Sequence, residues 1–417
     1  MRLFNYDVVV IGGGPAGIAA AISASKSCAK TILIEREGMF GGQATMSQVA
    51  AFCGFYTRGT HPDLVIGGVG ELLLNKMKKY GFDIKPYPSK STGNSNIKFD
   101  PEIMKVIFDE LLVESGTELR LHTQFVKANA VNHQINSIIC VDDDGELVIE
   151  GKQFIDTTGN GNLIQNLGLP IVWGDEYGNT QQASMVFKLS NLPSRDILNV
   201  EIENAIKQAK KDGIKNIFKE KGMIIKHEHD TIGYCTIPSV FVEHLNGETL
   251  TKAEINLRKQ VLSYVDVIRK YIRGCENVKL VQSGPQLGVR EGRRVIGEEI
   301  LLGKDVLACV KRNDSIGRAA WSVELHKGDR AVEYKLLPDN EYASIPLGII
   351  KARDCKNLWV GGRLVSTDSV AFGSLRVMGT SMVTGQAAGV AAALMTQRTS
   401  VSVVEIQSEL IRQGVLI

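Results

Sequence analysis

Three glycines near the start of the chain, Gly12, Gly14 and Gly17, have the spacing of a loop that binds a dinucleotide. The apolar run DVVVI precedes them and the small-residue run AAAISASK follows them, which indicates a buried strand, a turn and a helix. Gly12 would permit the tight turn, Gly14 would let the backbone approach a pyrophosphate, and Gly17 would let the helix pack closely on the strand. The N–H groups and the dipole at the start of such a helix attract phosphate. The loop therefore predicts a site for an adenine dinucleotide.

Glu35 ends a second apolar run, TILIE, where a carboxylate would accept hydrogen bonds from the adenosine ribose. NAD and FAD both fit these residues. Further features favour FAD: a second glycine loop at 41–45, short alternating strands before FIDTTGNG, and a GGR triplet ahead of a glycine-rich stretch near the C-terminus.

The strongest signal of a substrate site is a cluster of charged residues: Arg290, Glu291, Arg293 and Arg294. The planar guanidinium of arginine binds a carboxylate through two hydrogen bonds and stays charged, so arginines that face a flavin would suit an anionic substrate. The same residues could instead form an ion-pair network between domains with Glu298 and Glu299. On a strand Arg290 and Arg294 would share a face, whereas on a helix all three arginines would lie within one turn. Both interpretations stay open at this stage.

Other polar residues carry weaker signals. His326 could be an acid or base, or a histidine on the surface or in the core. Cys53 follows the second glycine loop, but no cysteine lies near it in the sequence, so we expect packing rather than a dithiol centre. No metal site is predicted, because the adjacent residues of the run 227–230 (HEHD) seldom complete a coordination shell.

Composition limits the class of protein. With 48 basic and 46 acidic residues, the chain has no charge excess that would attract nucleic acid. The seven cysteines are scattered without a CxxC pair, which favours a cytoplasmic protein, and no apolar stretch is long enough to span a membrane. The densest basic stretch predicts the solvated face of an amphipathic helix, with these lysines: Lys207, Lys210, Lys211, Lys215, Lys219, Lys221 and Lys226.

The elements that must position these residues form an α/β fold. A βαβ unit covers 6–36, helices follow at 71–81 and 101–116, and short antiparallel strands form a meander over 117–150. Helices at 202–220 and 251–273 and broad strands then indicate a separate α+β domain, before a buried strand and a helix at 374–396 restore the α/β pattern. The predicted parts are 1–170 and 341–417 for a Rossmann-like FAD-binding domain, and 171–340 for an inserted substrate domain.

The ordered motifs along the chain resemble a known family. They are GGGPAG, FDPEIMK, FIDTTGNG, PQLGVREGRRVIGEEI, YASIP, NLWVGGR and AFGSLRVMGTSMVTGQAAGVAAAL. The chain is similar to the FAD-dependent oxidoreductases of the glutathione reductase superfamily, and most to the branch with GG-x-A-T after the ribose acid and LGVRE-x-RR in the inserted domain. Fumarate reductase flavoproteins and aspartate oxidase resemble it at greater distance. The resemblance implies an FAD-binding domain of the glutathione reductase type.

The same resemblance implies which residues contact FAD. It assigns the diphosphate to Gly12, Pro15, Ala16 and Gly17, the adenosine to Glu35 and Arg36, and the pyrophosphate and ribityl region to Gly42, Gln43, Ala44 and Thr45. It assigns the adenine to the backbone of Val126, the adenosine half to Thr158 and Gly159, and the ribityl chain to Gly362 and Arg363. Many relatives have an acid where Arg363 stands. The dipole of the last helix would act on the flavin N1 and C2 carbonyl through Gly373, Ser374, Leu375 and Arg376.

These observations predict an enzyme that transfers a hydride between FAD and a small anionic substrate, with Arg290, His326 and Arg376 as catalytic candidates. The segment Val323-Glu324-Leu325-His326 departs from the D-x-H pattern of the family, which argues against a proton relay. Only one dinucleotide loop is present, so NAD(P)H or another electron acceptor would act transiently from the substrate cleft. The alternatives are a flavin monooxygenase and a flavin-binding electron-transfer or scaffold protein without a substrate of its own.

Overall fold

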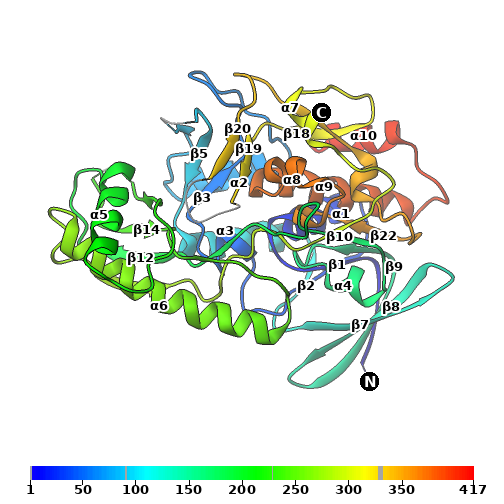
Figure 1. Cartoon of the computed structure of the whole chain (residues 1–417). Helices are drawn as coiled ribbons and strands as arrows, with labels where there is room; N and C mark the ends of the chain where they lie inside the picture. The colour runs from blue at the N-terminus through cyan, green and yellow to red at the C-terminus, as the bar shows by residue number, and fades with distance from the viewer. Residues whose placement is uncertain (1, 90–91, 228, 327–331) are drawn as a thin grey trace.

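The computed structural model describes residues 2–89, 92–227, 229–326 and 332–417. It has a mixed α/β fold with a larger part around a long sheet and a smaller part formed by α5 (Asn199–Lys211) and α6 (Gly247–Tyr271), at the left of Figure 1. Both chain ends belong to the larger part, as the return of the α/β pattern near the C-terminus predicted.

The main sheet has seven strands in the order β6-β2-β1-β9-β8-β7, with β22 also paired to β9. Its parallel half is fully buried at Val8, Val9 and Val10, which explains the continuous β-branched run. The predicted meander is confirmed for β7-β8-β9, the antiparallel half, whereas its first predicted strand is β6, which pairs parallel with β2. The strands are β1 (Arg2–Ile11), β2 (Thr31–Ile34), β6 (Glu118–Arg120), β7 (Gln124–Val131), β8 (Gln134–Asp142), β9 (Gly145–Asp156) and β22 (Leu358–Val360).

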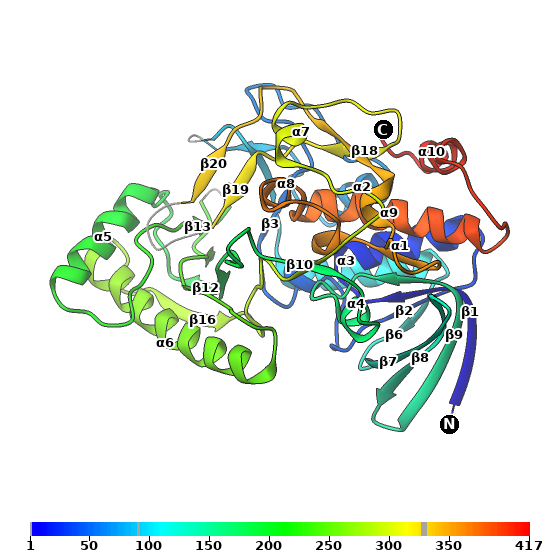
Figure 2. The ribbon, with the colours of Figure 1, turned by 45° about the vertical axis from the view of Figure 1, so that its right-hand side comes forward.

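Two helices, α1 and α9, lie side by side against this sheet (Figure 2). Their contact requires small residues, because a Cβ added at Gly385 would lie 2.0 Å from the Ala16 carbonyl oxygen, and one at Gly389 would lie 2.2 Å from that of Ala20. The helices of the larger part are α1 (Pro15–Lys26), α2 (Val69–Lys79), α3 (Pro101–Glu114), α4 (Asn162–Asn166), α7 (Gly303–Leu307), α8 (Ser369–Leu375), α9 (Met378–Met395) and α10 (Val403–Arg412).

Short strands complete the larger part. A three-stranded sheet and two strand pairs pack near α8 and α9 (Figure 1). These strands are β3 (Ala51–Cys53), β4 (Tyr87–Pro88), β5 (Ser95–Lys98), β18 (Ser315–Ala319), β19 (Val323–Leu325), β20 (Glu333–Lys335) and β21 (Ala343–Pro346).

The smaller part has its own hydrophobic core, which runs in the sequence from Ala183 to Val289. The chain enters it after β10 (Ile171–Trp173) and leaves it before β17 (Arg293–Val295), and these two strands pair antiparallel. Its strands are β11 (Ala183–Ser184), β12 (Phe187–Ser190), β13 (Ile224–Ile225), β14 (Gly233–Cys235), β15 (Ser239–Val240) and β16 (Lys279–Ser283). We call this part the inserted unit.

The inserted unit is shorter than the predicted domain at 171–340. Residues from Val295 to Leu337 include many side chains that pack in the first core. The sequence boundary followed a change in strand pattern, which is a local property, whereas core membership depends on the partners that each apolar face meets.

Two predicted helices end or begin elsewhere. The helix predicted at 202–220 is α5, which ends at Lys211, because Gly213 adopts a φ of +78°. The helix predicted at 374–396 is α9, which begins only at Met378, and it is preceded by the separate helix α8 at an angle of 94°. No single helix of the described ranges has both the length and the apolar character needed to cross a bilayer, although α8 and α9 together would pass by length and composition.

Candidate functional site

The first glycine loop lies between β1 and α1. A Cβ at Gly12 would lie 2.6 Å from the Thr157 carbonyl oxygen, and one at Gly17 would lie 1.8 Å from the Gly12 carbonyl oxygen, so both positions require glycine for packing. A Cβ at Gly14 would meet no atom within 4 Å. Gly14 therefore faces open space at the start of α1, where a ligand can approach the backbone.

The first turn of α1 has free hydrogen-bond donors. Within the described part of the chain, the backbone N–H groups of Ala16 and Gly17 make no hydrogen bond, and Pro15 has no N–H to satisfy. Free amides at the positive end of a helix dipole attract phosphate. This part of the structure fits a dinucleotide diphosphate.

Glu35 is held next to this turn by the backbone. One carboxylate oxygen accepts the N–H of Gly13 at 2.7 Å and the other accepts the N–H of Glu37 at 3.0 Å. Burial raises the pKa of Glu35 despite these two hydrogen bonds. Each oxygen keeps a lone pair that could accept a ribose hydroxyl. The neighbouring Arg36 is half exposed and pairs with Glu37 at 2.9 Å.

The second glycine loop packs directly on the first. Gly41 has a φ of +112° and donates its N–H to the Gly13 carbonyl oxygen at 2.8 Å, and a Cβ at Gly42 would lie 3.0 Å from the Gly14 Cα. The Thr45 hydroxyl donates to the Phe40 carbonyl oxygen at 2.7 Å. Gly42 thus lies beside Gly14, whereas Ala44 and Thr45 are fully buried. Contact of Gln43, Ala44 and Thr45 with the cofactor stays a prediction.

Val126 lies at a bulge of β7. The pairing of β7 with β8 shifts between Phe125 and Lys127, and the Val126 carbonyl oxygen accepts a long hydrogen bond, 3.5 Å, from Asn166. A bulge leaves backbone groups of the extra residue unpaired in the sheet. Adenine recognition by this backbone, which the resemblance implies, stays a prediction.

The turn after β9 is organised by Asp156, which is fully buried. Its carboxylate accepts hydrogen bonds from the backbone and hydroxyl of Thr158 and from the first amides of α4, and burial raises its pKa against these bonds. The Thr158 hydroxyl therefore donates its hydrogen bond to Asp156. The next residue, Gly159, has a φ of +73°.

Arg363 covers this turn. Its Nε donates to the Gly159 carbonyl oxygen at 2.5 Å and its Nη2 to the Asn160 side-chain oxygen at 3.0 Å, without a carboxylate partner in the described residues. Burial, and then the charge of Arg36, lower the pKa of Arg363 to about 10. A partly buried guanidinium without an ion pair, beside a helix that offers free amides, suits a diphosphate. Gly362 lies against the start of α1, with a Cβ position 3.2 Å from the Ala16 Cβ.

The prediction that Gly373, Ser374, Leu375 and Arg376 lie at the start of the last long helix is wrong. Gly373, Ser374 and Leu375 lie in the last turn of α8 and are fully buried, and the Ser374 hydroxyl donates to the Trp321 carbonyl oxygen at 2.5 Å. The helix N-terminus whose dipole could act on the flavin belongs to α9, which begins at Met378. The apolar pattern of 374–396 continues through the bend, so the sequence concealed the break.

A second group of polar residues lies where the inserted unit meets the larger part. We call Arg290, Glu324, His326 and Arg376 the charged cluster. Glu324 is its centre: Oε1 accepts from His326 Nε2 and Tyr334 Oη, each at 3.1 Å, and Oε2 lies 3.3 Å from Trp321 Nε1 and 3.5 Å from Arg376 Nη2.

The cluster fixes the protonation of its members. Burial opposes the charge of Glu324, but the hydrogen bond from His326 and the guanidiniums of Arg376 and Arg290 hold its pKa below the usual range. Burial, and then the charge of Arg290, lower the pKa of His326 to about 3. These two effects outweigh Glu324, which raises the pKa. The imidazole is therefore neutral at physiological pH. We assign the proton to Nε2 because Glu324 accepts there, which leaves Nδ1 as a base.

The arginines of the motif LGVREGRR do not all have the same role. The sequence left open an ion-pair network and a substrate site, and each interpretation fits some of these residues. Arg294 and Glu291 form a fully buried ion pair, with Arg294 also bonded to the carbonyl oxygens of Gly174 and Thr367. Arg293 donates to the Asn160 carbonyl oxygen at 2.8 Å.

Arg290 differs from both. It donates to the Gln182 carbonyl oxygen and to the Ser184 hydroxyl, each at 2.6 Å, and forms no ion pair among the described residues. Burial, and then the charge of Arg376, lower the pKa of Arg290 to about 10, so it stays charged at neutral pH. The other acids of the expected network lie apart, because Glu298 pairs with Lys351 and Glu299 with Arg312.

Several buried polar atoms have no partner in the described structure. Those near the charged cluster and the second glycine loop are Gln48 Oε1, Gln181 Nε2, Gln182 Oε1, His326 Nδ1 and Arg376 Nε. Buried polar groups normally form hydrogen bonds, so such a concentration indicates a site that a polar ligand completes. Gln48 also has a left-handed backbone, with a φ of +54°, which is uncommon for a residue other than glycine.

Sequence reasoning missed Glu324, and the statement that the His326 segment argues against a relay is wrong. Glu324 stands two positions before His326 at the end of β19, so that the two side chains lie on one face, and they are hydrogen-bonded. Cys53 lies close enough to the cluster to interact with Glu324 and Arg376, and its thiol donates to the Asn96 side-chain oxygen at 3.0 Å. Burial raises the pKa of this thiol.

Among the residues that the structure describes, no group of three or more metal-binding side chains comes together. Glu228, within the acidic and histidine run, lies outside the described residues.

The sequence profile of a family described as "FAD dependent oxidoreductase" matches residues 7–413. A stretch of 166 residues is 25% identical to the soluble pyridine nucleotide transhydrogenase of Ectopseudomonas mendocina (strain ymp), covering 38% of this chain and 32% of that protein. A stretch of 106 residues is 58% identical to the fumarate reductase (cytochrome) of Shewanella frigidimarina, covering 25% of this chain and 15% of that protein. The match thus spans less than a third of the transhydrogenase and about a seventh of the fumarate reductase.

The fold is also similar to that of a solved structure, a geranylgeranyl bacteriochlorophyll reductase-like protein from Thermoplasma acidophilum. The TM-score is 0.52 with 14% identity, over 99% of this chain and 84% of that one. At this identity the likeness shows the fold alone.

Proposed function

Because the chain belongs to the FAD dependent oxidoreductase family, we propose that it transfers a hydride between its FAD cofactor and a small anionic organic substrate held at the charged cluster. We also propose that the FAD-binding part is of the glutathione reductase type, since it combines one dinucleotide loop with the antiparallel meander. The observation that carries the proposal is the partly buried Arg290, which has no carboxylate partner among the described residues and lies beside unpaired polar atoms.

The residues that would hold FAD are those of the two glycine loops, Glu35 and Arg363. Their free amides, open backbone face and unpaired guanidinium supply the donors that a diphosphate needs. Bound flavin supplies two-electron chemistry, which the side chains of the protein cannot provide.

The charged cluster would bind and orient the substrate. Arg290 is fixed by two short hydrogen bonds, so its remaining donors are pre-oriented for an anion. When the substrate is oxidised, His326 Nδ1 accepts a proton from it, and Glu324 stabilises the imidazolium that forms. In the reverse direction the same nitrogen returns the proton.

The test is an anaerobic reaction of the FAD-loaded protein with a panel of small anionic metabolites, and of the photoreduced protein with the same panel. We expect at least one anion to bleach or restore the flavin absorbance with two-electron stoichiometry, while its neutral amide does not. His326→Gln should keep FAD and slow that step by about 100-fold to 10,000-fold, the usual contribution of a general base.

Other outcomes would overturn the proposal. Incorporation of an oxygen atom into the product would indicate a monooxygenase. Flavin turnover with a redox protein but with no small molecule would indicate an electron-transfer protein.

We further propose that NAD(P)H or another electron acceptor, if used, reaches the flavin through the substrate site, since only one dinucleotide loop is found in the sequence. A cytoplasmic location remains our proposal from the scattered cysteines.

A further inference from the structure

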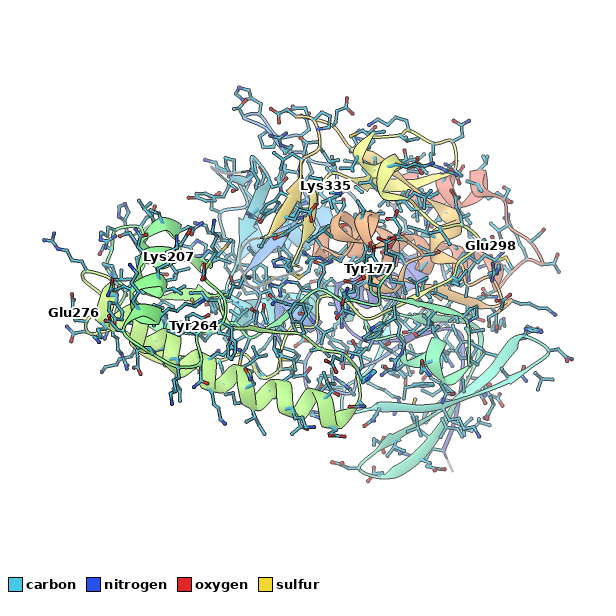
Figure 3. All side chains as sticks on the ribbon, in the orientation of Figure 1. Tyr177, Lys207, Tyr264, Glu276, Glu298 and Lys335 are labelled. Atoms are coloured by element: carbon cyan, nitrogen blue, oxygen red, sulfur yellow. The ribbon has the colours of Figure 1, made fainter. Side chains whose placement is uncertain are left out.

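Lys219 is buried, although the sequence pattern placed it on a solvated helix face. It lies beyond the end of α5 and is only 6% exposed. Its backbone is fixed by Tyr264 of α6, whose hydroxyl accepts the Lys219 N–H at 2.9 Å and donates to the Lys219 carbonyl oxygen at 2.8 Å. Figure 3 labels Tyr264 in the part of the molecule formed by α5 and α6. The position of this lysine is therefore determined by the core of the inserted unit.

The ammonium group of Lys219 has no hydrogen bond or ion pair in the described structure, whereas Lys226 shows how a buried lysine is normally satisfied. Lys226 Nζ donates to the carbonyl oxygens of Pro193, Ser194 and Asp230 at 2.9 to 3.1 Å. The charged groups that interact with Lys219 are Arg290 and Glu324. Printed contacts aside, the fold connects the two positions: Arg290 donates to the Ser184 hydroxyl, Ser184 pairs with Ser239 across β11 and β15, and Ser239 is hydrogen-bonded to Gln260, one turn of α6 before Tyr264. Lys219 is thus a third cation near the charged cluster.

The charges at this site do not balance. Among the residues that the structure describes, Glu324 is the one carboxylate that interacts with Lys219, Arg290 and Arg376, and it already lies 3.5 Å from Arg376 and accepts three other hydrogen bonds. Lys219 and Arg290 are left without compensation. Lys219 is buried and Arg290 is partly buried. Charges removed from water are normally paired, so two cations of one unit that form no ion pair in the described structure indicate a ligand that brings two negative charges.

We infer that Lys219 and Arg290 together bind a dianionic group of the substrate, either one phosphate monoester or two carboxylates. Both residues belong to the inserted unit, whereas Glu324, His326 and Arg376 belong to the larger part. Lys219 is therefore a specificity-determining residue that selects a doubly charged substrate. This inference rests on the proposed function and narrows the substrate class.

The probes are inorganic phosphate, malonate and acetate, titrated into the FAD-loaded protein at pH 7.5 and followed by calorimetry and by the flavin difference spectrum. Phosphate or malonate should bind at least tenfold more tightly than acetate, and the preferred one identifies the source of the two charges. Lys219→Met should weaken the preferred dianion at least tenfold and acetate less than twofold. Lys221→Met, which removes an exposed lysine two positions away, should change neither.

The pH profile tests the same residue without removing its charge. Burial, and then Arg290, lower the pKa of Lys219 to about 8, whereas Glu324 stays ionised and Arg290 keeps its proton to about 10. Affinity for malonate should therefore fall above pH 8 in the wild-type protein. Lys219→Arg should keep its affinity at pH 9, because a guanidinium does not lose its proton there.

Equal loss of acetate and dianion affinity in Lys219→Met, or a wild-type pH profile in Lys219→Arg, would overturn the inference. These outcomes would not affect the proposed function if an anionic substrate still reduced the flavin. If no anion bound while FAD remained in place, the proposed function itself would fail. Should Lys219→Met not fold, the profile of Lys219→Arg decides.

Discussion

The glycine loops and the charged cluster are built in opposite ways. The loops use backbone atoms: a Cβ at Gly17 would collide with the Gly12 carbonyl oxygen, and their polar groups are amides at the start of α1. The cluster uses side chains from segments far apart in the sequence, such as Arg290 and Arg376, and the residues that the structure describes do not balance their charges. In the first region the available space decides which residue is tolerated, and in the second region charge decides.

This difference separates two meanings of a buried polar site. The loops need glycine for the protein to fold as well as for the cofactor to bind. The cluster places cations where folding alone gains little from them, so we expect substitutions there to affect ligands more than stability.

The largest effect should come from Arg294, whose role we expect to be structural. If substitution of Arg294 and of Arg290 had the same effect, the contrast between structural and ligand-binding residues would not hold. Arg294→Ala leaves Glu291 charged and buried without a partner, which should lower the free energy of unfolding by about 3–5 kcal/mol. Denaturant unfolding measures this loss. Recovery of much of the stability in the double variant Glu291→Leu/Arg294→Met would support the assignment, and a near-native single variant would contradict it.

Arg290→Ala should weaken substrate binding and leave the stability of the protein nearly unchanged, in contrast to Arg294→Ala. Losing a desolvated contact to an anion should weaken substrate binding by about 2–5 kcal/mol, which is roughly 30-fold to several thousandfold. FAD content and the unfolding midpoint should stay near those of wild type, and the exposed Arg258→Ala serves as the control. A variant that lost FAD and stability together would show that Arg290 is structural.

The glycine loop allows a matched pair that sharpens the comparison. Gly17→Ala should destabilise the protein by about 1–3 kcal/mol, since an added methyl forces the Gly12 carbonyl oxygen to move. Gly14→Ala meets no protein atom, so it should keep the unfolding midpoint and weaken FAD binding instead. Differential scanning calorimetry and flavin content after gel filtration separate the two results. Equal destabilisation by both changes would contradict this geometry.

The smallest effect concerns Lys219 and has an unusual sign. Its pKa is lowered from 10.5 to about 8, so the folded state holds fewer protons than the unfolded state between these pH values, and stability should rise with pH across that window. Below pH 8 the buried ammonium costs its full amount. Lys219→Met should therefore stabilise the protein at neutral pH by about 1–3 kcal/mol and remove that part of the pH slope. Destabilisation at neutral pH would indicate a structural lysine.

The two regions also differ in what the sequence could predict. Gly12, Gly14, Gly17 and Glu35 share one βαβ unit, so spacing alone placed them, and the three antiparallel strands β7, β8 and β9 followed from alternation. The partner of His326 was readable in principle, because an acid two positions away on a strand shares its face. The position of Lys219 was not, since its burial depends on Tyr264, which is distant in the sequence.

The break between α8 and α9 shows a different limit. Residues on both sides of Arg376 are small or apolar and fully buried, so no polar face marks where one helix ends. Periodicity identifies a helix by the contrast between its two faces, and a helix that is buried all round has none.

The pairing of β10 with β17 has a consequence for how such a protein can evolve. The chain leaves the larger part at Ile171–Trp173 and returns at Arg293–Val295, and the two passages are adjacent antiparallel strands. The ends of the inserted unit are therefore close together, so the unit can be lengthened, shortened or exchanged as a cassette while the glycine loops keep their geometry. Since Lys219 and Arg290 travel with that cassette, a new ligand preference can be acquired by recombination at one two-stranded junction.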